Sequence, residues 1–329
     1  MANLRAGLIG LGMMGRHHAR NLRSIDGVEL VAVADAAGDP HGLAGDLAVL
    51  PDVDALLEQG LDYVVVAAPT MYHEEIGLKL AEAGVHALIE KPLAKTVDGA
   101  RALARAFADK GLVGAVGHIE RYNPALQSLR KRLEAGDLGD LYQVCTRRQG
   151  PFPARIADVG VIKDLASHDI DLTAWVTQRK YELVAARTMF KAGREYEDMV
   201  SATCQLEGGL MSNHLVNWLT PTKERLTVVT GEKGMYIADT LTADLTFYAN
   251  GSIVNTWDDI AQFRGVSEGD VTRYEIPKPE PLRTEHENFR DAVLGKEADI
   301  VTLEQGARVV EVCEAMIESA KTDRFVAIG

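Results

Sequence analysis

The first 120 residues alternate short apolar segments with segments of helical spacing. Residues 28–34 form a β-branched apolar run, and residues 63–68 read Tyr-Val-Val-Val-Ala-Ala. Between such runs, residues 74–83 and 97–108 place apolar side chains at helical intervals. Strands that alternate with helices form βαβ units, whose parallel strands are covered on both faces. This rhythm predicts a doubly wound α/β domain at the N-terminus.

After about residue 120 the pattern changes to successive strands. Apolar segments follow one another between residues 183 and 248 without helices, and Glu207-Gly208-Gly209 is typical of a hairpin turn between two of them. Such strands pair antiparallel. Helices are expected over residues 124–135, 164–176, 284–294 and 303–320. We therefore predict a parallel domain over residues 1–120 and an α+β domain over residues 121–329.

A glycine-rich turn follows the first apolar run. It matches G-x-G-x-x-G, with a predicted strand before it and a predicted helix after it. In that context the first glycine permits a tight turn, the second lets a pyrophosphate approach, and the third allows close helix–strand packing. The N–H groups that open the helix attract phosphate. We expect a dinucleotide to contact Gly10, Gly12, Met13, Met14 and Gly15.

Asp35 ends the next predicted strand and bears on the choice of nucleotide. A carboxylate there accepts hydrogen bonds from the ribose hydroxyls and repels a 2′-phosphate. Residues 36–41 that follow contain no Lys or Arg to bind such a phosphate. The sequence therefore favours NAD over NADP.

Two further loops should border the nucleotide, because ligands bind at the carboxyl ends of parallel strands. Thr70 and Thr96 are placed as helix N-caps, and His73 as a first-turn helix residue rather than a catalyst. Lys91 could point its ammonium group at a substrate oxygen or lie in a surface ion pair. The expected cofactor contacts from these loops are Ala68, Pro69, Thr70, His73, Glu90 and Lys91.

Asp164, His168 and Asp171 lie four and three residues apart on a predicted helix. This spacing places the three side chains on one helix face. A carboxylate beside a histidine can orient the ring and stabilise its protonated form. The alternative interpretation is a solvated helix face or a hydrogen-bonded core histidine.

These motifs occur in a fixed order: the glycine turn with Asp35, Ala68-Pro69-Thr70, Glu90-Lys91-Pro92, and Asp164 with His168. In this the chain resembles the Gfo/Idh/MocA family of NAD(P)-dependent oxidoreductases. The resemblance implies an N-terminal Rossmann domain and a C-terminal α+β domain with a large, mainly antiparallel open sheet. It also implies hydride transfer between nicotinamide and a sugar hydroxyl by Lys91, Asp164 and His168. Either His168 or Lys91 could be the base.

One stretch bears on the substrate. Residues 145–157 carry three arginines and no acid, and arginine suits bidentate phosphate recognition. The phrases at residues 117–124, 150–161 and 217–221 are similar to the branch that contains UDP-N-acetylglucosamine 3-dehydrogenases. The expected substrate contacts are Arg121, Tyr122, Asn123, Arg148, Arg155, Asp171, Asn217 and Trp218.

Other functions of the same fold remain open at this point. Relatives in the family act on inositol or free sugars, cleave glycosides with transient use of NAD, or bind NAD as non-catalytic sensors. A sensor has no need of the complete set Lys91, Asp164 and His168.

Composition excludes several other classes. The net charge of −13 argues against binding to nucleic acid or to anionic membranes. The three cysteines lie far apart with no CxxC pair, so we expect no structural metal, no disulfide framework and a cytoplasmic location. No apolar run approaches the ~20 residues of a membrane span, and no signal peptide is recognisable. Family resemblance implies a homodimer or homotetramer.

Overall fold

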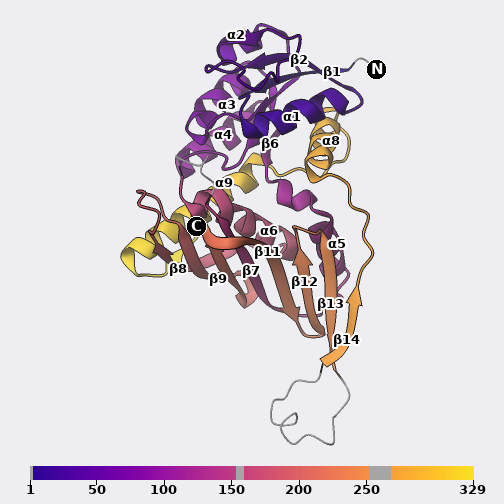
Figure 1. Cartoon of the computed structure of the whole chain (residues 1–329), viewed down its shortest axis with the longest axis vertical. Coiled ribbons are helices and arrows are strands. Elements are labelled where there is room, and N and C mark those ends of the chain that lie inside the picture. Colours follow the sequence, from indigo (N-terminus) through magenta and orange to yellow (C-terminus); the bar gives the residue numbers. More distant parts are fainter. Residues whose placement is uncertain (1–2, 153–158, 252–267) are drawn as a thin grey trace, which may run out of the picture. The chain divides into compact units, whose positions relative to one another are not determined.

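The computed structural model describes residues 3–152, 159–251 and 268–329 (Figure 1). The chain divides into two compact units. The first contains residues 1–119 and 279–314, and the second contains residues 120–278 and 315–329. Across the described ranges, no helix is long and apolar enough to cross a membrane.

Six parallel strands form the sheet of the first unit, in the order β3-β2-β1-β4-β5-β6. This is the Rossmann order, in which the chain starts mid-sheet and reverses direction between β1 and β4. The predicted doubly wound parallel domain is confirmed. The strands are β1 Leu4–Ile9, β2 Val28–Ala34, β3 Val49–Leu50, β4 Tyr63–Val66, β5 His86–Glu90 and β6 Gly114–Gly117.

Helices cover both faces of this sheet. α1 (Met13–Ser24) and α8 (Pro281–Val293) pack on the face that carries Tyr63 and Val65. The opposite face carries Val64 and Val66. It is covered by α2 (Val53–Leu57), α3 (His73–Glu82), α4 (Val97–Asp109) and the start of α9 (Leu303–Thr322). Alternate side chains of one buried strand thus fill two cores, as near-continuous apolar strands require.

The two predicted N-caps have different outcomes. Thr96 caps α4, and its side chain accepts a hydrogen bond from the N–H of Gly99. Thr70 is not an N-cap. Residues Thr70–Tyr72 form a 3₁₀ turn, and α3 begins only at His73, with no side-chain cap at Tyr72. The 3₁₀ turn uses the backbone groups that a capping threonine would have satisfied.

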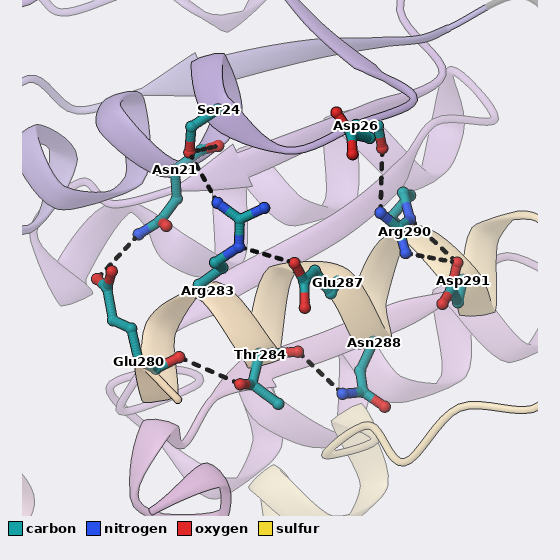
Figure 2. A network of polar contacts seen from close by, with 10 residues as sticks. All are labelled: Asn21, Ser24, Asp26, Glu280, Arg283, Thr284, Glu287, Asn288, Arg290 and Asp291. Carbon is teal, nitrogen blue, oxygen red and sulfur yellow. Dashed lines mark hydrogen bonds and ion pairs between the residues drawn. The ribbon is translucent and has the colours of Figure 1, made fainter. Parts of the chain in front are cut away.

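Residues 279–314 pack with the first unit, although the sequence division placed them with the second domain. Phe289 of α8 is buried edge-on against Tyr63, with ring centroids 5.4 Å apart. Figure 2 shows the polar contacts that join α8 to the end of α1. Arg290 donates to the Asp26 carbonyl (3.0 Å) and Arg283 to the Ser24 hydroxyl (3.5 Å). The spacing of apolar residues predicts which face of a helix is buried, but it does not predict which sheet that face packs against.

Nine strands form the sheet of the second unit, in the order β14-β13-β12-β11-β7-β10-β9-β8-β15. Among the strands that the structure describes, only β7 and β10 pair parallel, and β14 and β15 are edges. The predicted open, mainly antiparallel sheet is confirmed. The strands are β7 Leu141–Pro151, β8 Tyr181–Met189, β9 Met199–Leu206, β10 Leu210–Asn217, β11 Leu219–Gly231, β12 Gly234–Asp239, β13 Asp244–Asn250, β14 Glu268–Arg273 and β15 Val326–Ala327.

Two helices of the second unit, α5 (Pro124–Glu134) and α6 (Ser167–Thr177), lie behind this sheet in Figure 1. The strands alternate accordingly: Val144, Thr146 and Arg148 of β7 are buried, and the residues between them are not. The hairpin predicted at residues 207–209 joins β9 and β10.

We expect Phe289→Ala to destabilise the first unit by about 3–5 kcal/mol, because it opens a cavity against Tyr63. Hydrogen exchange should accelerate in peptides from β1 and β4. Peptides from β9 and β10 should exchange as in the wild type. Leu294→Ala, at a residue 39% exposed, is the matched control and should change little. Equal acceleration in both sheets would contradict the assignment of α8 to the first unit.

Candidate active site

The turn between β1 and α1 is shaped by its own glycines. Gly10 has a φ of +96°, and a Cβ there would lie 2.5 Å from the Ala67 carbonyl oxygen, at the switch point between β1 and β4. A Cβ on Gly15 would lie 2.0 Å from the Gly10 carbonyl oxygen. These two glycines are therefore required by the fold. Gly12 differs, because a Cβ there would meet no atom within 4 Å.

The open side of Gly12 is the place where a pyrophosphate fits. Gly12 is the N-cap of α1 and makes no side-chain cap, and the first turn of α1 carries no acidic residue. The N–H groups that open the helix and its positive dipole end both favour an anion. The exposed Met13 and half-buried Met14 follow on the same turn. The turn thus fits the dinucleotide predicted from the glycine pattern.

Asp35 lies at the end of β2 beside this turn. Its Oδ2 accepts a hydrogen bond from the Leu11 N–H (2.7 Å), and its Oδ1 accepts one from the Ala37 N–H (2.8 Å). An ionised carboxylate has about four acceptor sites, so acceptor sites remain for ribose hydroxyls. Its negative charge opposes a 2′-phosphate, which supports the preference for NAD.

His73 joins two loops at the carboxyl edge of the sheet. Its buried ring lies with Nδ1 2.9 Å from the Pro92 carbonyl oxygen and Nε2 2.8 Å from the Ala68 carbonyl oxygen. Burial lowers the pKa of His73, although both carbonyl contacts oppose the shift. The ring therefore holds the loops after β4 and β5 together. Contacts of His73, Ala68, Pro69 and Thr70 with the cofactor stay predictions.

Lys91 follows directly on β5, and Glu90 lies beneath it. The Glu90 carboxylate is 7% exposed and accepts hydrogen bonds from the Lys91 N–H (3.0 Å) and from His18 Nε2 (2.9 Å). Burial acts to raise the pKa of Glu90, but the His18 bond and the charges of His18 and Lys91 outweigh it and lower the pKa. An ionised carboxylate thus supports the Lys91 loop.

The predicted Asp164–His168 pair lies in the second unit, on a segment that is not a plain α-helix. Residues Ile162–Ala166 form a π-helical turn, in which the Ser167 N–H donates to the Ile162 carbonyl five residues back, and α6 begins at Ser167. Asp164 is buried and His168 half-buried. Single π-turns are frequent at functional sites. Apolar spacing predicted the helix, but could not show the wider turn.

Two buried ion pairs hold the first half of α6. Arg121 donates to both oxygens of Asp171 (2.8 and 2.6 Å), and both side chains are nearly fully buried. Arg148 donates to Asp169 (2.9 Å) and to Glu120 (2.8 Å). Three of the expected substrate contacts, Arg121, Arg148 and Asp171, therefore tie α6 to the 3₁₀ turn at residues 119–122 and to β7. Their contact with substrate stays a prediction.

Asn123, Asn217 and Trp218, three of the other expected substrate contacts, also have partners within the unit. Asn123 caps α5, and the Asn217 side chain accepts from the N–H groups that follow it. Trp218 is buried, edge-on to Phe152, with the Arg194 guanidinium 4.8 Å from its ring centroid. Tyr122 is buried, and Arg155 lies outside the described residues.

Arg225 is a candidate site residue that the sequence analysis did not name. It is half-buried, lies opposite Arg148 in the β7–β11 register, and donates to the Gln149 carbonyl (2.6 Å). Burial and the charge of Arg148 lower its pKa, while the charges of nearby acids including Asp164 oppose this. Alternation along this strand could not have placed it inward, because apolar Leu226 and Val228 would put Arg225 on the polar face.

Comparisons with known proteins agree with this geometry. Residues 4–118 match the family model described as "Oxidoreductase family, NAD-binding Rossmann fold", and residues 126–237 match the Gfo/Idh/MocA C-terminal domain. The chain is 32% identical over 297 residues to UDP-N-acetylglucosamine 3-dehydrogenase of Acidithiobacillus ferrooxidans, covering 89% of this chain and 90% of that protein. A solved structure of that enzyme matches with a TM-score of 0.83 and 29% identity over 98% of each chain.

A second relative is named for a different substrate. The chain is 31% identical over 183 residues to scyllo-inositol 2-dehydrogenase (NAD(+)) of Bacillus subtilis, covering 53% of this chain and 54% of that protein.

A Rossmann sheet with this glycine turn at its switch point, in a chain matching an oxidoreductase model, defines an NAD-binding oxidoreductase. The chain belongs to the Gfo/Idh/MocA family, which its sequence motifs had indicated.

Two glycine variants should distinguish the glycine that cofactor binding requires from the glycine that the fold requires. Gly12→Ala should melt as the wild type does but bind NAD at least tenfold more weakly, about 1.4 kcal/mol, because its methyl group occupies the open side of the turn. Gly15→Ala should lose about 1–3 kcal/mol of stability or more, because its methyl group collides with backbone. Thermal melts without NAD and calorimetric titration with NAD give both values. Unchanged NAD affinity in Gly12→Ala would place the pyrophosphate elsewhere.

Proposed function

We propose that this oxidoreductase oxidises a sugar hydroxyl, and that its substrate is a nucleotide sugar, first of all UDP-N-acetylglucosamine at C3. The observation that carries the proposal is the similarity to a UDP-N-acetylglucosamine 3-dehydrogenase over nearly the whole of both chains. Support comes from Lys91 at the carboxyl end of a Rossmann strand and from Asp164 and His168 on the π-turn segment.

The proposed roles follow from the surroundings of each side chain. When bound, NAD supplies a hydride acceptor at C4 of its nicotinamide ring. His168 takes the hydroxyl proton as general base, since a neutral imidazole is available near neutral pH. Lys91 hydrogen-bonds the same oxygen and stabilises the charge that develops on it. Asp164 orients His168 or the substrate.

The ionised Glu90 beneath the Lys91 loop bears on which residue is the base. The charge of Lys91 contributes to the lowered pKa of Glu90, so the two side chains interact. We therefore assign Lys91 the role of hydrogen-bond donor to the substrate oxygen and His168 the role of base.

Recognition of a diphosphate would need arginines that are not already neutralised. Arg121 and Arg148 face carboxylates in buried pairs, so a phosphate would have to compete with Asp171 or Asp169. We assign the diphosphate to Arg155 because it lies in the stretch of residues 145–157 that carries three arginines and no acid. Arg155→Ala should raise KM for the nucleotide sugar and leave kcat nearly unchanged.

The second candidate function is oxidation of inositol, which the similarity to a scyllo-inositol 2-dehydrogenase favours. An inositol carries no diphosphate, so Arg155→Ala would leave its KM unchanged.

The substrate proposal is tested by incubating the protein with NAD and UDP-N-acetylglucosamine, with hydroxylamine present to trap a ketone. We expect NADH fluorescence and an oxime at C3 of the sugar. Turnover of scyllo-inositol instead would support the second candidate. NAD binding without turnover of either compound would contradict both and favour a sensor.

His168→Ala should lower kcat by about 10²–10⁴-fold, or roughly 3–5 kcal/mol, because the general base is lost. The dissociation constant for NAD should stay within about twofold of wild type. His41→Ala, which removes an exposed histidine, is the control. A kcat within threefold of wild type (roughly 0.6 kcal/mol) would exclude His168 as the base.

A further inference from the structure

Three buried side chains of the first unit form a hydrogen-bonded chain beneath the Lys91 loop. His286 Nε2 of α8 lies 2.8 Å from His18 Nδ1 of α1, and His18 Nε2 lies 2.9 Å from Glu90 Oε1 of β5. The exposed fractions of His286, His18 and Glu90 are 1%, 0% and 7%. The second oxygen of Glu90 accepts from the Lys91 N–H at 3.0 Å.

The carboxylate fixes the proton at one end of this chain. An ionised Glu90 only accepts, so His18 carries a proton on Nε2 and donates it to Glu90. Burial, followed by the charge of His18, lowers the pKa of His286 well below its usual range, so that ring stays neutral and its Nε2 can either donate or accept. His18 Nδ1 and His286 Nε2 therefore share one hydrogen between them.

The chain connects elements that are far apart in the sequence. α1 begins at the glycine turn, β5 ends at Glu90, and α8 comes nearly two hundred residues after it. Hydrogen bonds from Arg283 to Ser24 and from Arg290 to Asp26 join α8 to the end of α1, so they hold the two histidine-bearing helices together (Figure 2). The edge-on approach of the two imidazole rings, with centroids 5.1 Å apart, belongs to the same contact.

Stability alone is a weak explanation for this arrangement. Apolar side chains of similar volume stabilise a core as well as a buried polar network does, or better. A polar chain instead holds one carboxylate in one orientation. Glu90 is therefore fixed on its two oxygens, by His18 on one and by the Lys91 N–H on the other.

We propose that His18 and His286 are positioning residues for Lys91, which act by fixing Glu90 and through it the backbone of the Lys91 loop. The inference rests on the proposed role of Lys91. Other titratable groups at this end of the sheet are His73, on which the Glu90 charge acts, and Glu285, which is buried beside His286 in α8.

The first test needs no substrate. In the NAD-bound protein, the acetylation rate of Lys91 by acetic anhydride is measured by mass spectrometry relative to that of the exposed Lys95. His286→Leu and His18→Leu should raise this ratio at least threefold (roughly 0.6 kcal/mol), because the Lys91 loop is no longer fixed. His286→Gln, whose amide nitrogen can donate to His18, should restore the wild-type ratio. His17→Leu, at an exposed histidine on the same helix, is the control.

The second test uses turnover of UDP-N-acetylglucosamine. Misplacing a catalytic group by about 1 Å can cost 10²-fold in rate. We expect kcat to fall about 10–100-fold in His286→Leu and His18→Leu, with KM and NAD affinity nearly unchanged, and to recover in His286→Gln. Melting curves verify that each variant is folded. His286→Leu is the milder change, because His286 is the member of the hydrogen-bonded chain that lies farthest from Glu90.

Two outcomes overturn the inference: a Lys91 acetylation ratio that does not change in folded His286→Leu, or a His286→Gln variant as impaired as His286→Leu. Failure of the wild type to turn over UDP-N-acetylglucosamine overturns the substrate proposal alone, since the acetylation test is independent of it.

Discussion

The close approach of α1 to the end of β1 is the constraint on which the first unit depends. Only a residue without a Cβ fits at Gly15, against the Gly10 carbonyl, and at Gly10, against the backbone after β4. That contact directs the N-terminus of α1 to the point where the strand order reverses. The same approach leaves space beside Gly12. The same steric requirement thus sets the path of the chain and leaves open the space in which we predict the cofactor phosphates.

Buried pairs of arginine and carboxylate side chains support the second unit. Its buried arginines mainly neutralise carboxylates of α6 and of residues 119–122, and breaking such a pair from one side costs about 3–5 kcal/mol. These pairs hold the segment that carries Asp164 and His168. Arg121 and Arg148 thus support the segment that carries two of the predicted site residues, and their own contact with substrate stays a prediction.

Features that depend on residues near in the sequence could be predicted, and features that depend on tertiary contacts could not. β2 has the bounds that its apolar run predicts, and the Gly10 turn follows from local backbone sterics. The two-residue β3 and the five-residue α2 are too short to show a period, so they were missed. The partners of Arg121 and Arg148 depend on tertiary packing, which charge spacing does not report. The placement of α8 was missed for the same reason.

The position of α8 has a chemical consequence as well as a structural one. Had residues 279–314 packed only on the second sheet, His18 would face the core with an unpartnered Nδ1, a cost of about 1–3 kcal/mol. His286 supplies that partner, and Phe289 covers Tyr63 three residues later on the same helix face. A single helix thus closes the apolar core and completes the polar chain to Glu90. The Rossmann sheet and the Lys91 loop are therefore stabilised by α8, a helix that follows β14 of the second sheet in the sequence.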